Sequence, residues 1–214
     1  MKLLPSLLFS MFFLHFYFYY SASINFDYFM LAETWPKSFC KKNQCIPNVP
    51  LEFTVHGLWP KNNTRPHTYE CSTDPNLVDD MDTKLNKVWP SLTGNNKKFW
   101  NQEWKRHGTC SKMSSVNYFN HAIVLYEKNN IKDILKKPLT PGGAAALTPG
   151  GAANSADIQM LIKSVTGFEP QLDCEKNSAD LLEVRLCFDT DLSNPTYISC
   201  PSHLVCPRRI NLPL

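Results

Sequence analysis

The stretch LEFTVHGLWP, residues 51–60, carries the strongest fold signals in this chain. Val and Phe favour a pleated, half-buried strand, and Gly57 and Pro60 end that strand with a turn. His56 is therefore expected near a strand end, where side chains often point into clefts. A buried histidine that only packs and hydrogen-bonds would fit the same pattern, so this stretch alone leaves both interpretations open.

The N-terminus predicts export. Residues 1–23, MKLLPSLLFSMFFLHFYFYYSAS, place Lys2 before an apolar, aromatic run that ends in small residues. This is typical of a signal peptide cleaved after Ser23, and the run is short and polar for a membrane anchor. We expect a soluble, secreted protein with one domain over residues 24–214. Its mild positive charge permits a polyanionic partner without requiring one.

All eight cysteines follow the predicted signal peptide. They are Cys40, Cys45, Cys71, Cys110, Cys174, Cys187, Cys200 and Cys206. An even number in an exported chain predicts four disulfides, whose pairing the spacing leaves open. A zinc site is the less favoured alternative, because no CxxC pair is present. One sequon, Asn62-Asn63-Thr64, predicts a glycan at Asn62.

Periodicity and capping signals predict an α+β domain. Helices are expected at residues 74–90, 95–110, 114–130 and 155–167. The second is expected to be ended by Gly108, the third to be capped by Ser114 or Ser115, and the last to be capped by Ser155 and ended by Gly167. Strands are expected at residues 24–36, 181–188 and 196–200. The segment LTPGGAA occurs twice, at 139–145 and 147–153, and is expected to form a flexible surface loop rather than helix or strand.

The segment FWNQEWKRHGTC, residues 99–110, carries a second candidate site. Glu103 and His107 are four residues apart, so they share one helix face, and Arg106 lies close to both. A solvated helix face with an ordinary Glu–His pair would show the same spacing.

Two histidines together indicate a specific chemistry. One neutral imidazole can accept a proton while a protonated one donates another, and a nearby cation can stabilise a charged transition state. The chain has no GxSxG nucleophile motif and no HExxH metal motif. Attack of a substrate's own hydroxyl on its phosphodiester needs only these groups, and RNA carries that hydroxyl at the 2′ position.

At this point the residues resemble a family. FTVHGLWP (53–60) and FWNQEWKRHGTC (99–110) are similar to the two active-site segments of the ribonuclease T2 family, and the chain looks most like plant S-ribonucleases of self-incompatibility. WPKSFC (35–40), LLEVRLCFD (181–189) and the terminal Cys-Pro segments extend the resemblance along the mature chain.

The resemblance implies a role for each site residue. His107 would be the general base for the 2′-hydroxyl and His56 the general acid for the 5′-oxygen. Glu103 would assist and stabilise the transition state. Arg106 stands where the family usually has lysine and keeps the positive charge. No metal or cofactor is implied.

The resemblance also implies substrate contacts. Gln102 replaces a family histidine that contacts phosphate and can still donate a hydrogen bond. Trp35 lies in the Thr-Trp-Pro segment that helps to hold a base. Trp59 is the best candidate for stacking on a base, and Phe99 is expected to line the pocket. Core packing alone is the alternative explanation for Trp59 and Phe99.

The family's disulfides imply the pairs Cys40–Cys45, Cys71–Cys110, Cys174–Cys206 and Cys187–Cys200. The family fold implies a central antiparallel sheet packed with helices. The implied activity is a monomeric, metal-independent endoribonuclease acting on single-stranded RNA through a 2′,3′-cyclic phosphate, with pollen F-box proteins as partners. The alternatives are an S-like defence or phosphate-starvation ribonuclease, and a catalytically impaired storage or recognition homologue.

Overall fold

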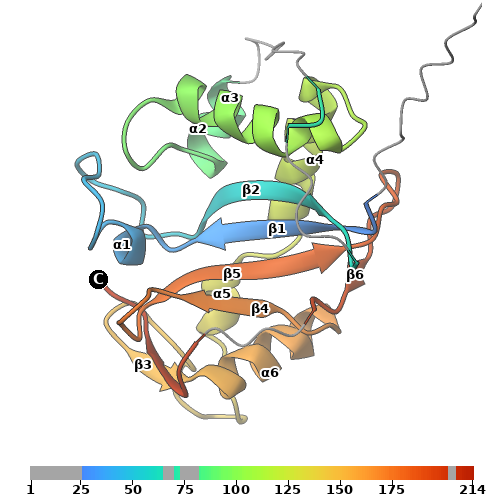
Figure 1. Ribbon diagram of the computed structural model, residues 1–214. Coiled ribbons are helices and arrows are strands. Elements are labelled where there is room, and N and C mark those ends of the chain that lie inside the picture. Colours follow the sequence, from blue (N-terminus) through green and yellow to red (C-terminus); the bar gives the residue numbers. More distant parts are fainter. Residues whose placement is uncertain (1–25, 65–69, 73–81, 202–205) are drawn as a thin grey trace, which may run out of the picture.

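A computed structural model describes residues 26–64, 70–72, 82–201 and 206–214 (Figure 1). The predicted signal peptide and the first half of the helix expected at 74–90 lie outside these residues. The strands are β1 Tyr28–Thr34, β2 Thr54–Lys61, β3 Ala152–Asn154, β4 Gln171–Cys174, β5 Leu181–Phe188, β6 Tyr197–Ile198 and β7 Arg209–Asn211. The helices are α1 Pro36–Phe39, α2 Asp82–Val88, α3 Asn96–Arg106, the 3₁₀ turn η2 Gly108–Cys110, α4 Ser115–Glu127, α5 Ile131–Leu135 and α6 Ser155–Thr166.

An antiparallel sheet of order β2-β1-β5-β4 forms the centre of the molecule, and β6 pairs with the C-terminal end of β5. Helices α2 and α3 lie beyond the β2 edge, and α6 lies beyond the β4 edge (Figure 1). The α+β prediction is confirmed, with the helices packed around one sheet. None of the helices in the described part of the chain is both long and apolar enough to cross a membrane.

Strand β1 is buried along its whole length because both of its faces are covered. Phe29 and Leu31 point into the main core, while Tyr28 and Met30 pack against the Cys187–Cys200 disulfide on the other face. A continuous apolar run of this kind is typical of a central strand.

All four disulfide pairs implied by the resemblance are confirmed. They are Cys40–Cys45, Cys71–Cys110, Cys174–Cys206 and Cys187–Cys200. Cross-links of this kind restrict the unfolded chain and stabilise each closed loop.

The observed capping residues agree with the prediction at Ser114 and Gly167 and differ from it at the start of α6. Ser114 accepts a hydrogen bond from the Asn117 amide at the start of α4, and Gly167 ends α6 in the left-handed conformation at φ 86°. The cap of α6 is Asn154, not Ser155, because the Asn154 side chain accepts from the Ala156 amide.

The two LTPGGAA copies differ in structure, so the prediction of a single loop is wrong for the second. The first copy, 139–145, is exposed throughout. In the second, Leu147 is buried and Ala152 and Ala153 belong to β3, which pairs with β7. The second copy lies beside the C-terminal segment, which supplies backbone pairing through β7. The same amino-acid sequence therefore forms a short strand in the second copy.

Deletion of residues 139–146 is expected to leave RNA cleavage unchanged. The Leu147 amide already donates to the Leu135 carbonyl at 2.9 Å, and the deletion would place these residues four apart, the spacing of a helical hydrogen bond. Deletion of 147–154 gives the same sequence except for Ala in place of the Asn154 cap. This second variant should lose about 1 kcal/mol more of unfolding free energy. Equal stabilities in urea unfolding would contradict the capping assignment.

Glu33 is a carboxylic acid buried in the core face of β1. It is 1% exposed, and neither carboxyl oxygen has a hydrogen-bond partner among the described residues. Burial raises its pKa well above the ordinary value of 4.5. The folded protein therefore holds this proton at a pH where the unfolded chain has lost it, so Glu33 reduces stability as the pH rises above 4.5.

Replacing Glu33 by Gln is expected to stabilise the protein at pH 7 and to change little near pH 4. The amide keeps the shape and removes the titration. Urea unfolding of wild type and variant across this range measures the effect. A variant whose stability follows the wild-type pH dependence would show that Glu33 is not the group responsible.

Candidate active site

A β-bulge in β2 aims His56 and Trp59 to the same side. In the β1–β2 ladder Ala32 pairs with Gly57 and Glu33 with Val55, which leaves His56 as the extra residue. A bulge shifts the alternation of side chains by one. Val55 and Leu58 consequently point into the core, while the His56 and Trp59 rings meet edge to face at 5.2 Å.

Two buried indoles hold the bulge from behind. The Trp89 indole N–H donates to the His56 carbonyl at 2.8 Å, and the Trp100 indole N–H donates to the Trp89 carbonyl at 2.7 Å. A carbonyl at a bulge lacks its ladder partner, so this hydrogen bond satisfies it. Trp89 and Trp100 thus fix the backbone of the candidate acid, which sequence patterns did not indicate.

Helix α3 supplies the other half of the site. Asn95 caps its start by accepting from the Lys98 amide. Glu103 lies on its last turn, and His107 follows as the C-cap in a non-helical conformation (φ −121°, ψ −47°). The helix therefore ends just before Gly108, as predicted, and η2 carries the chain to Cys110. The disulfide between Cys110 and Cys71 joins this end to the segment after β2.

The four predicted catalytic side chains line one cleft of about 690 Å³. Its walls are His56, Trp59, Lys61, Glu70, Glu103, Arg106, His107 and Arg185. Of these, Lys61, Glu70 and Arg185 were not predicted. A cleft with two imidazoles, two guanidinium groups and a buried carboxyl has the groups that proton transfer at a phosphodiester requires.

Trp59 lies at the centre of this cleft. Its indole N–H donates to Glu103 at 3.2 Å, and its ring lies 5.6 Å from the His107 ring. The Lys61 ammonium and the Arg185 guanidinium lie 5.3 Å and 5.5 Å from the Trp59 ring, within the range of cation–π attraction. Trp59 therefore sets the spacing between β2 and α3.

The absent side chain of Gly57 permits this approach. A Cβ there would lie 2.3 Å from the Glu103 carboxylate and 2.3 Å from the Trp59 indole nitrogen. At Gly108, a Cβ would lie 2.1 Å from the Trp104 ring. The packing between β2 and α3 therefore leaves no room for a side chain at the glycine that follows each histidine.

His56 has a carboxylate partner that sequence analysis missed. Its Nδ1 lies 2.5 Å from Oε1 of Glu183 on β5, and its side chain remains 39% exposed to the cleft. Burial alone would lower the His56 pKa, but the charge and hydrogen bond of Glu183 outweigh it and raise that pKa to about 9. The alternation of LLEVRLCF was the available signal, because it places Glu183 and Arg185 on one face of β5.

Glu103 is buried at 5% exposure on the opposite wall. Burial raises the pKa of Glu103. The charge of His56, the hydrogen bond from Trp59 and the charge of Arg106 lower this pKa, but burial outweighs them. Its ionisation is thus coupled to His56 across the cleft.

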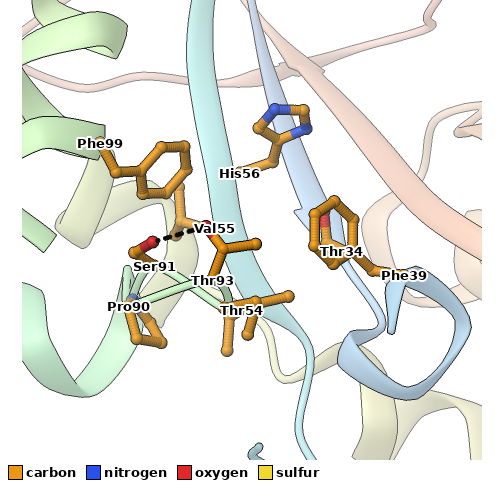
Figure 2. A pocket seen from close by; sticks show the side chains of 10 residues that line it. Thr34, Phe39, Thr54, Val55, His56, Pro90, Ser91, Thr93 and Phe99 are labelled. Carbon is orange, nitrogen blue, oxygen red and sulfur yellow. Dashed lines mark hydrogen bonds between the residues drawn. The ribbon is translucent and has the colours of Figure 1, made fainter. Parts of the chain in front are cut away.

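A second, smaller cavity of about 170 Å³ adjoins the cleft at His56 (Figure 2). Phe99 forms one wall, and Thr34 and Phe39 lie on the other side of His56 in this view. Ser91 and Thr93 add hydroxyls, whose oxygens lie 3.4 Å apart. Phe99 thus lines a pocket as expected, with its ring stacked 6.3 Å from that of His56.

Two predicted substrate contacts lie elsewhere. Trp35 is fully buried, packs on Phe53 and donates its indole N–H to the Pro213 carbonyl at 2.8 Å. Its assignment to substrate is wrong, because the chain between β1 and α1 turns this side chain into the core, while Thr34 lines the cavity. Gln102 is exposed on α3 and lines neither cavity.

The described residues contain no group of three or more His, Cys, Asp or Glu side chains placed to hold a metal ion. The fold and the cleft define a small disulfide-linked protein in which two histidines, a buried carboxyl and guanidinium groups face one another.

Residues 26–200 match the ribonuclease T2 family. The chain belongs to this family and is an endoribonuclease. It is 34% identical to Ribonuclease 1 of Arabidopsis thaliana over 79% of this chain and 78% of that protein. It is 30% identical to Ribonuclease S-1 of Pyrus pyrifolia over 90% and 88% of the two chains.

Solved structures agree with this assignment. The self-incompatibility-associated SF11-RNase of Nicotiana alata superposes with a TM-score of 0.77 at 26% identity, over 89% of this chain and all of that one. Ribonuclease MC1 from bitter gourd seeds superposes with a TM-score of 0.75 at 29% identity, over 87% of this chain and all of that one.

Proposed function

We propose that the protein cleaves single-stranded RNA by transphosphorylation, with His107 as general base and His56 as general acid. The observation that carries this assignment is the contact between Glu183 and His56 in a cleft that also holds His107. Glu183 keeps His56 protonated at neutral pH, which makes His56 the proton donor. His107, on the other wall of the cleft, is then the acceptor.

The proton and bond changes balance within the substrate and the two histidines. His107 takes the proton of the ribose 2′-hydroxyl, and the 2′-oxygen forms a bond to phosphorus. The bond between phosphorus and the 5′-oxygen breaks as His56 donates a proton to that oxygen. The products are a 2′,3′-cyclic phosphate and a 5′-hydroxyl. Arg106 and Glu103 border the reacting phosphate, where the guanidinium stabilises its charge.

The cavity beside His56 is proposed to hold a nucleobase. Phe99 offers a ring face for stacking, and Thr34, Ser91 and Thr93 offer hydroxyls that can donate to or accept from a base edge. A base in this cavity must leave the stack of a duplex, which favours single-stranded RNA. Trp59 is held between the two histidines by its own contacts, and we propose that it shapes the cleft and supports the phosphate.

Cleavage of RNA in excess EDTA tests the reaction. RNA should be cut to cyclic phosphate ends, whereas matched DNA and 2′-O-methyl RNA should remain intact because neither offers a nucleophilic 2′-hydroxyl. Cleavage of DNA, or loss of activity in EDTA, would overturn the mechanism.

We further propose that the protein is secreted and acts as a monomeric pistil S-ribonuclease of self-incompatibility, with pollen F-box proteins as partners. Secretion is supported by the signal-like residues 1–23. The chain is similar to Ribonuclease S-1 and, at 31% identity, to Extracellular ribonuclease LE of Solanum lycopersicum. Asn62 lies partly exposed just after β2 and is proposed to carry a glycan. The similarity to Ribonuclease 1 keeps an S-like role as the second candidate.

Transcript confined to the style, and loss of pollen rejection when the transcript is silenced, would support the S-type role. Equal expression in leaf and root would contradict it.

A further inference from the structure

Glu183 lies beside His56 and exchanges no proton with the substrate in the proposed reaction. It is 4% exposed on β5, and its Oε1 contacts His56 Nδ1 at 2.5 Å. The Thr34 hydroxyl donates to the same oxygen at 3.4 Å. A carboxylate removed from water to this degree requires charged or hydrogen-bonded partners, and here a candidate catalytic histidine is one of them.

Arg185 holds the other oxygen of Glu183. Its Nε donates to Glu183 Oε2 at 2.9 Å, and its Nη2 reaches the same oxygen at 2.8 Å. The guanidinium is fixed in turn by β4, because Nη1 donates to Gln171 at 3.0 Å and Nη2 donates to the Asp173 carboxylate. A planar fork with partners on three sides has little freedom to turn, so it fixes the Glu183 carboxylate as well.

We propose that Glu183 is a positioning residue for the general acid: it accepts a hydrogen bond from the Nδ1–H group of His56, and Arg185 holds it in that geometry. This inference rests on the proposed function. With Nδ1 occupied, Nε2 is the nitrogen that remains to donate to the leaving 5′-oxygen. Carboxylates that orient histidines in this way fix both the tautomer and the ring direction.

The charges around His56 set the direction of the pH effect. Glu183 and Arg185 face it from β5, and Glu103 faces it from α3. His107, Arg106, Lys61 and Glu70 line the same cleft. Burial and the charge of Arg185 lower the His56 pKa, whereas the charges of Glu183 and Glu103 raise it, with Glu183 the strongest of the raising groups. Removing the Glu183 charge should therefore lower the pKa of His56.

The first test is Glu183→Gln, with Glu169→Gln as the matched control. Glu169 pairs with Lys163 on the surface, outside both cavities. We expect Glu183→Gln to lower kcat about 10- to 100-fold with little change in KM, by analogy with other residues that orient a functional histidine. The alkaline limb of its pH–rate profile should move to lower pH, because the general acid loses its proton earlier. An alkaline limb unchanged from wild type would overturn the proposal.

A second test compares Glu183→Gln in the wild-type and His56→Ala backgrounds. If Glu183 acts through His56, its replacement should have almost no further effect once the imidazole is gone. A full additional loss in the His56→Ala background would mean that Glu183 acts on substrate or on the fold, and would contradict the proposal.

A third test measures the protonation of His56 by NMR titration of the wild-type protein, so it depends neither on enzymatic activity nor on a variant that folds. His56 should titrate near pH 9 and carry a proton on Nδ1 throughout. A midpoint near 6.5, the ordinary histidine value, would contradict the positioning role. Failure of the proposed function is distinguishable from this, because it would show as an inactive wild type with His56 still paired to Glu183.

Discussion

Replacing His107 by Ala is expected to lower kcat/KM for RNA by about a thousandfold. The variant loses the group that takes the 2′-hydroxyl proton, and positioned general bases contribute about 10²–10⁴-fold. Trp59 and Glu103 keep their mutual hydrogen bond, so binding should suffer less than turnover. The loss should therefore fall mainly in kcat, which initial rates over a range of RNA concentrations separate from KM.

His121→Gln is the matched control for this variant. His121 is a buried histidine on α4 that lines neither cavity. Its replacement should leave the rate close to that of wild type. A His107→Ala variant that folds and cleaves at the control rate would remove His107 from the mechanism.

Replacing Gly57 by Ala is expected to lower kcat/KM about 100-fold although every predicted catalytic side chain is retained. The added Cβ would overlap the Glu103 carboxylate and the Trp59 indole, each at 2.3 Å. Both must move, and displacements of about 1 Å in an active site cost on the order of 10²-fold in rate. Thermal unfolding should show a loss of stability as well, because both groups are packed between β2 and α3.

Gly143→Ala provides the comparison for Gly57. Gly143 lies in the exposed first LTPGGAA copy, where a Cβ would meet the Thr140 hydroxyl at 3.0 Å, the Thr140 carbonyl at 3.1 Å and the Pro138 Cβ at 3.6 Å. This variant should keep the wild-type rate. If Gly57→Ala were as active as Gly143→Ala, the close approach of β2 and α3 would have no role in catalysis.

Local signals in the sequence predicted the two halves of the site. The HGLWP and WKRHGTC segments each combine a histidine with glycine and tryptophan, and the structure brings both to one cleft. The bulge at His56 was not predictable, because it depends on the register between β1 and β2. A register is set by the whole sheet rather than by one strand.

The contact between His56 and Glu183 spans 127 positions along the chain. Alternation in LLEVRLCF predicts that Glu183 and Arg185 share a face, but a polar face of a strand is usually a solvated one. Only the order β2-β1-β5 turns that face toward His56. Trp35 shows the opposite error. Its side chain was assigned to the substrate site because of its sequence motif, but it packs in the core.

The division of labour between the two histidines can be measured with one pair of substrates. A nucleoside 3′-(4-nitrophenyl phosphate) has a leaving group that departs without protonation, whereas a dinucleotide requires a proton at its 5′-oxygen. On the aryl ester, His56→Ala should recover most of the wild-type rate and His107→Ala should remain slow. If both variants lost equal activity on both substrates, or if His107→Ala were the one that recovered, the assignment of acid and base would be contradicted.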